Sequence, residues 1–344
     1  MDNLLPETSR KKWTAVFVAF IVLFTAVCLG YMNLNYDSLA RYPFRDENSR
    51  ELIKKYLNDE EIAYIIEYSI PPNMFVAYID SPGFNIYHAA EYKKLSEQQW
   101  QKTPAMIVRM VEETLPYMDV DTLMTYLIDG NYSFDDVDAY ISSGDYMQNS
   151  ELVMFAGETD VFLDAAHTVS TRRPVLKTVD PEKIASKDGK RIQLTETAAN
   201  SLYNLCTDIS RGLESSRACA GLVISDGYIS FDDQAERYED AVVSFGDNAR
   251  FYEPMPGHSE HQLGLAVDFG ISGIMDESFE KTRQAQWLES NAWKYGYLQT
   301  WNVSDEPVTG IKGQNWHYRY VGLTLAETIH GMGITFAEYI TRYN

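Results

Sequence analysis

The first hydrophobic feature of the chain is an uncharged apolar stretch at residues 13–34, which follows a short polar segment with three basic residues. A helix of about 20 apolar residues crosses a bilayer. Basic residues before such a stretch predict a cytoplasmic N-terminus, and Trp13 and Tyr31 lie where interfacial aromatic residues are expected. We therefore predict a cytoplasmic tail at 1–12, a transmembrane anchor at 13–34 and an extracytoplasmic remainder.

A cleaved signal peptide is the alternative interpretation of this apolar stretch. The run is longer than the apolar core of a typical signal peptide, and no A-x-A cleavage sequence follows it. Both features favour an uncut anchor, and they predict a single-pass protein of the cell membrane.

Residues 35–172 alternate short amphipathic patterns with Pro- and Gly-containing turns, which predicts a mainly helical extracytoplasmic region. The clearest helical periods lie at 51–56, 60–68 and 107–115. Segments 58–79 and 118–141 are loosely alike, and this similarity fits a degenerate helical repeat as well as it fits coincidence. The region carries no motif that indicates chemistry.

A polar stretch at 164–192 predicts a domain boundary near Arg173. Beyond it, a helical period runs from 195 to about 213, an apolar strand pattern follows at 220–225, and strands later alternate with helices. We therefore predict that residues 173–344 form an α+β domain.

Composition narrows the class of protein. Hydrophobic residues make up 45% of the chain and aromatic residues 13%, as in a folded protein rather than a disordered one. The 50 acidic residues outnumber the 29 basic ones and give a net charge of −21, so nucleic acid is a poor partner. Only Cys206 and Cys219 follow the anchor; whether they are bonded stays open, because sequence does not give the geometry that a disulfide needs.

Candidate chemistry is concentrated in residues 256–269, which contain His261 and Asp268. Zinc binds histidine nitrogen and carboxylate oxygen, and a hydrolytic site uses three protein ligands with one open position for water. His317, within the sequence Asn-Trp-His-Tyr at 315–318, is the candidate third ligand. The pattern predicts a Zn²⁺ site formed by His261, Asp268 and His317.

These stretches resemble the D-Ala-D-Ala carboxypeptidase family of zinc peptidases, which includes the vancomycin-resistance enzymes and shares a superfamily with hedgehog domains. Residues 259–268 match its S-x-H-x-x-G-x-A-x-D motif in full, and 314–317 correspond to its E-P-W-H motif. The resemblance covers about residues 175–340. It implies a hedgehog-like zinc domain that acts on the stem peptides of peptidoglycan.

Two catalytic positions depart from the family pattern. Gln314 stands where the family has its general-base glutamate, and a neutral amide cannot accept the proton of a metal-bound water. Ile229 stands where the family has an arginine that is implied to hold the substrate, and isoleucine supplies no cationic donor. The resemblance implies substrate contacts for Ser259, Gln234 and Trp316, which match family positions.

We therefore expect a cell-surface zinc protein that binds stem peptides or a surface protein, with impaired catalysis. The alternatives are an active D,D-carboxypeptidase or endopeptidase with a rewired base, and a structural surface protein with a vestigial cleft. Asp305, Glu306 and Arg237 are conceivable replacement groups, although their ordinary interpretation is solvent-facing charge. His258 is interpreted as a surface residue, with an extra ligand or a proton shuttle as the alternative.

Overall fold

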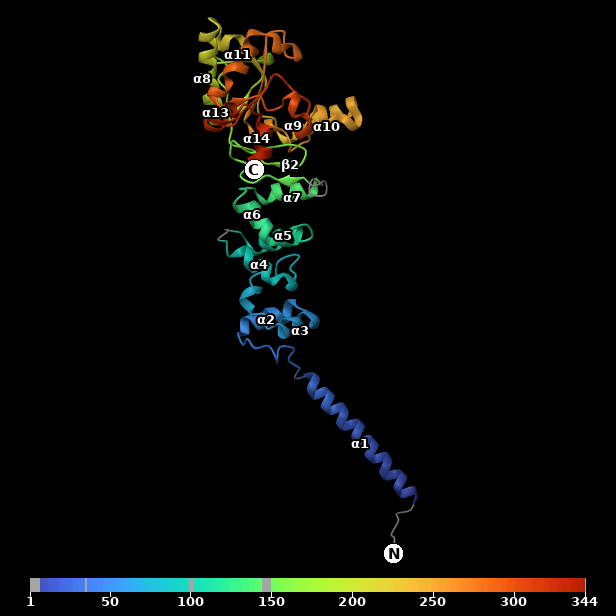
Figure 1. The fold of residues 1–344 in the computed structure, drawn as a ribbon. Coiled ribbons are helices and arrows are strands. Elements are labelled where there is room, and N and C mark those ends of the chain that lie inside the picture. The colour runs from blue at the N-terminus through green and yellow to red at the C-terminus, as the bar shows by residue number, and fades with distance from the viewer. Residues whose placement is uncertain (1–6, 35, 99–101, 144–149, 344) are drawn as a thin grey trace. The chain divides into compact units, whose positions relative to one another are not determined.

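The computed structural model describes residues 7–34, 36–98, 102–143 and 150–343. The chain divides into two compact units, Met1–Glu112 and Glu113–Asn344 (Figure 1). The domain limits predicted at 34/35 and 172/173 are finer than this division and stay predictions. Residues 1–6 of the predicted cytoplasmic tail lie outside the described residues.

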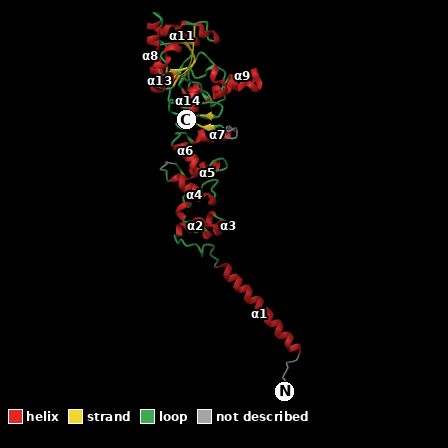
Figure 2. Ribbon diagram, viewed as in Figure 1, coloured by secondary structure: helices red, strands yellow, loops and turns green. Residues whose placement is uncertain are grey.

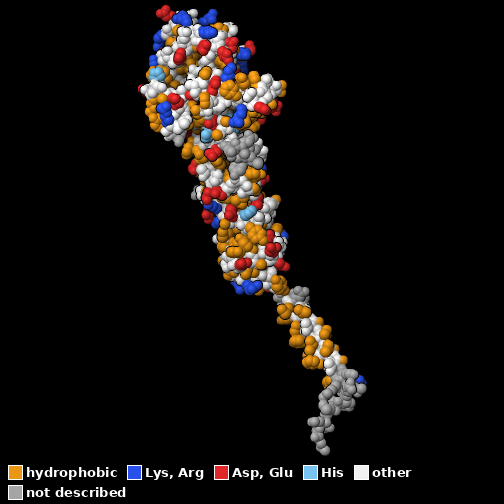
Figure 3. Space-filling model, turned by 45° about the vertical axis from the view of Figure 1, so that its right-hand side comes forward, with side chains coloured by type: hydrophobic (Ala, Val, Ile, Leu, Met, Phe, Trp, Pro, Cys, Tyr) orange, Lys and Arg blue, Asp and Glu red, His pale blue; other side chains and the backbone are white. Residues whose placement is uncertain are grey.

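The first unit is helical in its described part, as Figure 2 shows. Its helix α1 (Glu7–Leu34) includes the segment Lys12–Met32, which is long and apolar enough to cross a membrane, a property that a signal sequence shares. Figure 3 shows hydrophobic side chains along this helix. The remaining helices are α2 (Glu47–Tyr56), α3 (Asp59–Glu67), α4 (Ala89–Ser96) and α5 (Pro104–Thr114), the last of which reaches into the second unit.

Local sequence explains where the short helices begin. The Asn58 side chain accepts hydrogen bonds from the first backbone N–H groups of α3, and the Glu61 carboxylate accepts one from the Asn58 backbone N–H, which completes a capping box. The helices pack around a buried core that includes Ile53, Ile65 and Phe75. The helical periods predicted for this unit are confirmed, with limits that shift by a few residues.

The second unit is mixed α and β, which confirms the predicted fold class for its C-terminal part. It opens with α6 (Val120–Ile128), α7 (Phe134–Ser142) and a parallel strand pair, β1 (Glu151–Leu152) and β2 (His167–Thr168). A second small pair joins β3 (Lys177–Thr178) and β5 (Gln193–Leu194). The later helices are α8 (Glu196–Gly212), α9 (Phe231–Phe245), α10 (Ala249–Tyr252), α11 (Arg283–Asn291), α12 (Glu306–Thr309), α13 (Leu323–Met332) and α14 (Phe336–Tyr343).

A five-stranded sheet forms the centre of this unit, in the order β4-β6-β7-β9-β8. Its strands are β4 (Ala185–Ser186), β6 (Leu222–Asp226), β7 (Ala266–Ile271), β8 (Tyr297–Leu298) and β9 (His317–Tyr320). The β4–β6 pair is parallel, whereas β6–β7, β7–β9 and β8–β9 are antiparallel. Residues 266–270 of β7 are all buried, because this strand has a neighbour on each side and is covered on both faces.

The predicted helix at 195–213 and strand at 220–225 correspond to α8 and β6. Thr195 caps α8 with its side-chain oxygen, and a disulfide joins Cys206 on this helix to Cys219 in the turn before β6. The pairing left open by the sequence is thus present, and it links α8 to the turn that leads into β6.

The segment before Arg173 packs against the part of the unit that carries the motif. The Thr168 hydroxyl donates to the Gly257 carbonyl at 3.1 Å, and the Gln262 amide donates to the Ser170 carbonyl at 2.6 Å. Residues 150–172 therefore contribute to the surroundings of the motif, although the sequence placed them in the preceding region.

Gly264 provides a test of the turn that precedes β7. Its φ is +67°, and an added Cβ would lie 2.8 Å from Leu176 Cδ2, whereas Gly189 has a similar φ of +69° with nothing within 4 Å. We expect Gly189→Ala to lower the free energy of unfolding by ~1–2 kcal/mol through backbone strain. Gly264→Ala should lose ~1–3 kcal/mol more through overpacking, measured by denaturant titration of the full chain in detergent. Equal losses at both positions would contradict this account of the turn.

Candidate metal centre

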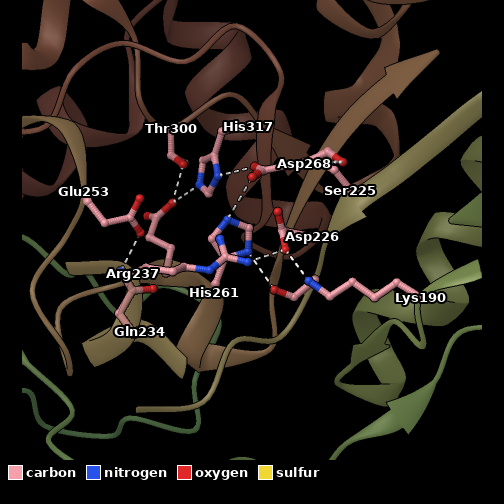
Figure 4. Close-up of polar contacts among 12 residues, drawn as sticks. Lys190, Ser225, Asp226, Gln234, Arg237, Glu253, His261, Asp268, Thr300 and His317 are labelled. Carbon is pink, nitrogen blue, oxygen red and sulfur yellow. Dashed lines mark hydrogen bonds and ion pairs between the residues drawn. The ribbon is translucent and has the colours of Figure 1, made fainter. Parts of the chain in front are cut away.

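Strand register brings two of the predicted ligands together. Asp268 on β7 is the direct pairing partner of His317 on β9, and side chains of paired residues project from the same face of a sheet. His261 enters from the 3₁₀ turn Glu260–Leu263, which immediately precedes β7. One ligand atom from each of the three residues lies within 4.8 Å of the others, and all three side chains are buried (Figure 4).

Hydrogen bonds orient both imidazole rings toward Asp268. His261 Nδ1 lies 2.7 Å from the Gly227 carbonyl oxygen, which can only accept, so Nδ1 carries a proton and Nε2 faces Asp268 Oδ2 at 3.4 Å. His317 Nδ1 lies 2.9 Å from Asp268 Oδ1, and its Nε2 lies 2.9 Å from Glu260 Oε2. Each ring therefore turns one nitrogen to the centre while an oxygen atom holds the other.

Glu260 belongs to a buried charged network behind His317. Its Oε2 accepts a hydrogen bond from the Thr300 hydroxyl at 2.5 Å, and its Oε1 accepts one from Arg319 Nη1 at 2.8 Å. Arg319 is itself fully buried, and its Nη2 donates to the backbone carbonyls of Thr159 and Val161. A buried ion pair needs such additional hydrogen bonds to offset its desolvation.

The electrostatics of the network favour ionised carboxylates. Burial alone would raise the pKa of Glu260, but the charge of Arg319 and the hydrogen bond with His317 lower it to about 2. Burial likewise opposes ionisation of Asp268, but His261 and His317 lower its pKa below the ordinary range. Burial alone would lower the pKa of His317, whereas hydrogen bonds to Asp268 and Glu260 raise it to about 9.

The three side chains fit a zinc ion. Two imidazole nitrogens and one carboxylate oxygen are donors that zinc takes, and three protein ligands leave a fourth position for water or substrate. Ligand histidines in metal sites usually donate their second nitrogen to a carbonyl or carboxylate, as His261 does to Gly227 and His317 does to Glu260. The contact with Gly227 fixes His261 as the tautomer that metal binding needs, whereas His317, whose pKa is raised to about 9, must release the Nδ1 proton that faces Asp268 to bind the ion.

An aromatic ring completes the surroundings of His317. The Trp301 ring stacks on the imidazole with a centroid distance of 3.7 Å and an interplanar angle of 5°, and Trp301 is only 3% exposed. This contact restricts rotation of His317 and keeps water from one of its faces.

The other predicted site residues lie close to the ligands along the chain or through backbone contacts. The Gln314 carbonyl accepts from the His317 N–H at 3.2 Å, and the Ile229 N–H donates to the His261 carbonyl at 3.4 Å. Ile229, Ser259 and Gln234 are buried, whereas Trp316 is half-buried. Gln234 Nε2 donates hydrogen bonds to Glu253 Oε1 at 2.6 Å and to the Pro254 carbonyl at 2.8 Å. Their roles toward a substrate stay predictions.

Three of the interpretations made from sequence were wrong about exposure. His258 is 2% exposed, with Nδ1 2.7 Å from the Asp164 carbonyl, and it does not belong to the His261–Asp268–His317 cluster. Asp305 is also 2% exposed and accepts hydrogen bonds from Asn302 and Thr335, which makes it a structural residue. Arg237 is half-buried and paired with Asp226.

Sequence analysis missed several residues of the centre. Glu260 directly precedes His261, and Arg319 follows His317 by two positions on a strand, which places it on the same face. These spacings could have indicated that Glu260 and Arg319 form an ion pair next to the ligand histidines. No local pattern indicates that Glu253, in the loop before the motif, lies near the ligands.

Comparisons with known proteins relate the C-terminal part of the chain to carboxypeptidases. The family model for D-alanyl-D-alanine carboxypeptidase (VanY) matches residues 191–323. A D-alanyl-D-alanine carboxypeptidase of Enterococcus faecalis is 31% identical over 128 residues, which cover 34% of this chain and 47% of that protein.

Two solved structures are also similar. The structure of the LdcB LD-carboxypeptidase, described as revealing the molecular basis of peptidoglycan recognition, is 25% identical with a TM-score of 0.51. The match covers 57% of this chain and 91% of that chain. A solved VanY D,D-pentapeptidase in complex with Zn(II) is 24% identical with a TM-score of 0.42, over 53% of this chain and 98% of that chain.

The matched region includes all three predicted ligands. The chain spans about half the length of the curated relatives it matches. The resemblance found from the two motifs is confirmed.

Glu260 offers a test of the network behind the ligands. We expect Glu260→Gln to weaken zinc binding ~10–100-fold, because His317 loses its charged partner. The free energy of unfolding should fall by ~3–5 kcal/mol, because Arg319 is left buried without its counter-ion. Chelator competition on the folded protein and denaturant titration measure the two effects.

Glu277→Gln is the matched control, since Glu277 pairs with Lys312 at 2.7 Å on the surface. It should leave zinc affinity unchanged and cost less than ~1 kcal/mol. Zinc binding by Glu260→Gln within two-fold of the wild type would show that Glu260 does not support the metal.

Proposed function

We propose that this chain, whose residues 191–323 match the D-alanyl-D-alanine carboxypeptidase family model, is a cell-surface protein that binds zinc and peptidoglycan stem peptides with impaired catalysis. The observation that carries the proposal is an asymmetry within one site. His261, Asp268 and His317 form a complete ligand set with its supports, while Gln314 stands at the position of the family's general base.

Zinc held by these three residues would polarise a peptide carbonyl and acidify a bound water molecule. The protein must also remove a proton from that water, and the amide of Gln314 holds water by hydrogen bonds without accepting its proton. A positioned general base contributes ~10²–10⁴-fold in rate, and we expect a loss on that scale. Binding of the peptide does not need the base and therefore survives.

The proposed substrate class is based on the relatives. The relatives are named as carboxypeptidases, and one of them is described in terms of peptidoglycan recognition. A peptide that ends in D-Ala-D-Ala is therefore the first ligand to test. A surface protein whose exposed end imitates such a peptide is the second partner class.

The helix α1 supports the proposed location. Its apolar segment Lys12–Met32 is long enough for a single membrane span, and basic residues precede it, which favours a cytoplasmic N-terminus. The net charge of −21 argues against a nucleic-acid partner. We infer that the carboxypeptidase-like domain lies outside the cell, where peptidoglycan is found.

One observation favours a second candidate, an active zinc carboxypeptidase with a rewired base. Glu253 is a half-buried carboxylate next to Gln234, and Figure 4 shows it among the residues of the centre. Burial raises its pKa above the ordinary value despite the hydrogen bond from Gln234, and the charges of His261 and Asp268 act on it. A carboxylate in such surroundings is a suitable proton acceptor.

Release of D-alanine from a pentapeptide ending in D-Ala-D-Ala separates the two candidates. We expect the zinc-loaded full chain in detergent to bind this peptide but to release D-alanine at least ~10²-fold more slowly than Gln314→Glu, tested alone and together with Ile229→Arg. Asn315→Asp is the matched control, because it makes the same change of charge one residue away and should restore nothing.

Turnover by the wild type at the rate of Gln314→Glu would refute impaired catalysis. If Glu253→Gln then abolished that turnover, the rewired-base candidate would hold. Failure of both restored variants to release D-alanine would show that the two altered positions do not explain the loss.

A further inference from the structure

Arg237 lies at the metal centre without a part in the chemistry described above. It is one turn beyond Gln234 on α9, and the positions 234, 237 and 241 form one face of this helix, on which Gln234 and Ala241 are buried. Arg237 Nη2 donates to Asp226 Oδ1 at 2.6 Å, and Lys190 Nζ donates to the same oxygen at 2.7 Å. Figure 4 shows this group beside His261.

Strand register explains why this cationic group lies beside the ligands. Asp226 on β6 pairs with Asp268 on β7, and Asp268 pairs with His317 on β9, so the three side chains form a row across one face of the sheet. The charges of Asp268 and Glu253 act on Arg237: burial would lower the pKa of the guanidinium, but Asp226 and these two carboxylates raise it. Asp226, at one end of this row, therefore connects the predicted metal ligands to Arg237.

Asp226 does not use the full hydrogen-bonding capacity of Arg237. Two cations, Arg237 and Lys190, share one oxygen of the Asp226 carboxylate. A guanidinium has five N–H donors, and within the described part of the chain the Arg237 side chain makes one hydrogen bond, through Nη2. Its planar fork suits a second carboxylate, which can be bound through two parallel hydrogen bonds.

A peptide whose terminal residue is removed at this metal carries its free carboxylate one residue beyond the scissile carbonyl. Ile229, which is 3% exposed, supplies no charge to receive that carboxylate. We propose that Arg237 binds the C-terminal carboxylate of the peptide and thereby determines specificity for free peptide ends. This inference rests on the proposed function, since it names the part of the peptide that the site recognises.

The role of Arg237 is distinct from simple stabilisation of Asp226. Lys190 already provides a counter-ion to the same oxygen at 2.7 Å, so Asp226 stays paired when Arg237 is replaced. A structural role would change stability but would not change the preference between a free acid and its amide. The experiment below measures that preference.

The test compares two ligands, the pentapeptide ending in D-Ala-D-Ala and the same peptide with a C-terminal amide. Binding is measured by fluorescence anisotropy with zinc-loaded full chain in detergent. We expect the wild type to favour the acid ~10–100-fold, as a charge-assisted hydrogen-bonded pair does. Arg237→Gln should remove this preference while leaving affinity for the amide unchanged, and Arg237→Lys should keep part of it.

Arg211→Gln is the matched control, because Arg211 also pairs with a neighbouring aspartate, Asp208, at 2.7 Å, but on the exposed surface of α8. It should keep the full preference for the acid. An unchanged preference in both Arg237→Gln and Arg237→Lys would overturn the proposal, as would a wild type that binds both peptides equally. A zinc-loaded wild type that binds neither peptide would refute the proposed function itself, and this inference with it.

Discussion

Asp268 places a carboxylate in the interior of the second unit, where a charge is stable only when cationic or hydrogen-bonding groups surround it. The pairing of β7 with β9 supplies His317, and the turn before β7 supplies His261. His317 in turn needs Glu260, and Glu260 needs Arg319, whose own donors reach the backbone of the segment before Arg173. One buried charge thus connects the sheet, the motif and a distant segment of the chain.

These linked contacts explain why the predicted metal ligands tolerate substitution less than Gln314 and Ile229 do. Replacing Glu260 or Arg319 leaves an unpaired charge in the interior, which affects both stability and metal binding. Gln314 and Ile229 take part in backbone hydrogen bonds with the ligand segments, and those bonds do not depend on the side chain. The side chains at these two positions can therefore change while the geometry of the His261–Asp268–His317 cluster stays intact.

The sequence predicted the parts of this arrangement that depend on local patterns. The helices of the first unit, α8, β6 and the three ligands follow from periodicity and from the spacing of His261, Asp268 and His317. Glu253 could not be placed, and Arg237 was named only as a conceivable replacement group, because their proximity to the ligands depends on how α9 and the loop before the motif fold together. The exposure of His258 and Asp305 was misjudged for the same reason: a polar residue in a loop looks solvent-facing until its buried partner is known.

The central claim is that His261, Asp268 and His317 hold a zinc ion, and metal analysis with X-ray absorption at the zinc edge tests it most directly. The account predicts one zinc per chain, bound only by nitrogen and oxygen atoms, with zinc–nitrogen distances of about 2.0–2.1 Å. The signal should disappear in His317→Gln and persist in His258→Gln. A protein that retains no zinc after purification with excess metal, or that keeps it when His317 is replaced, would contradict the account.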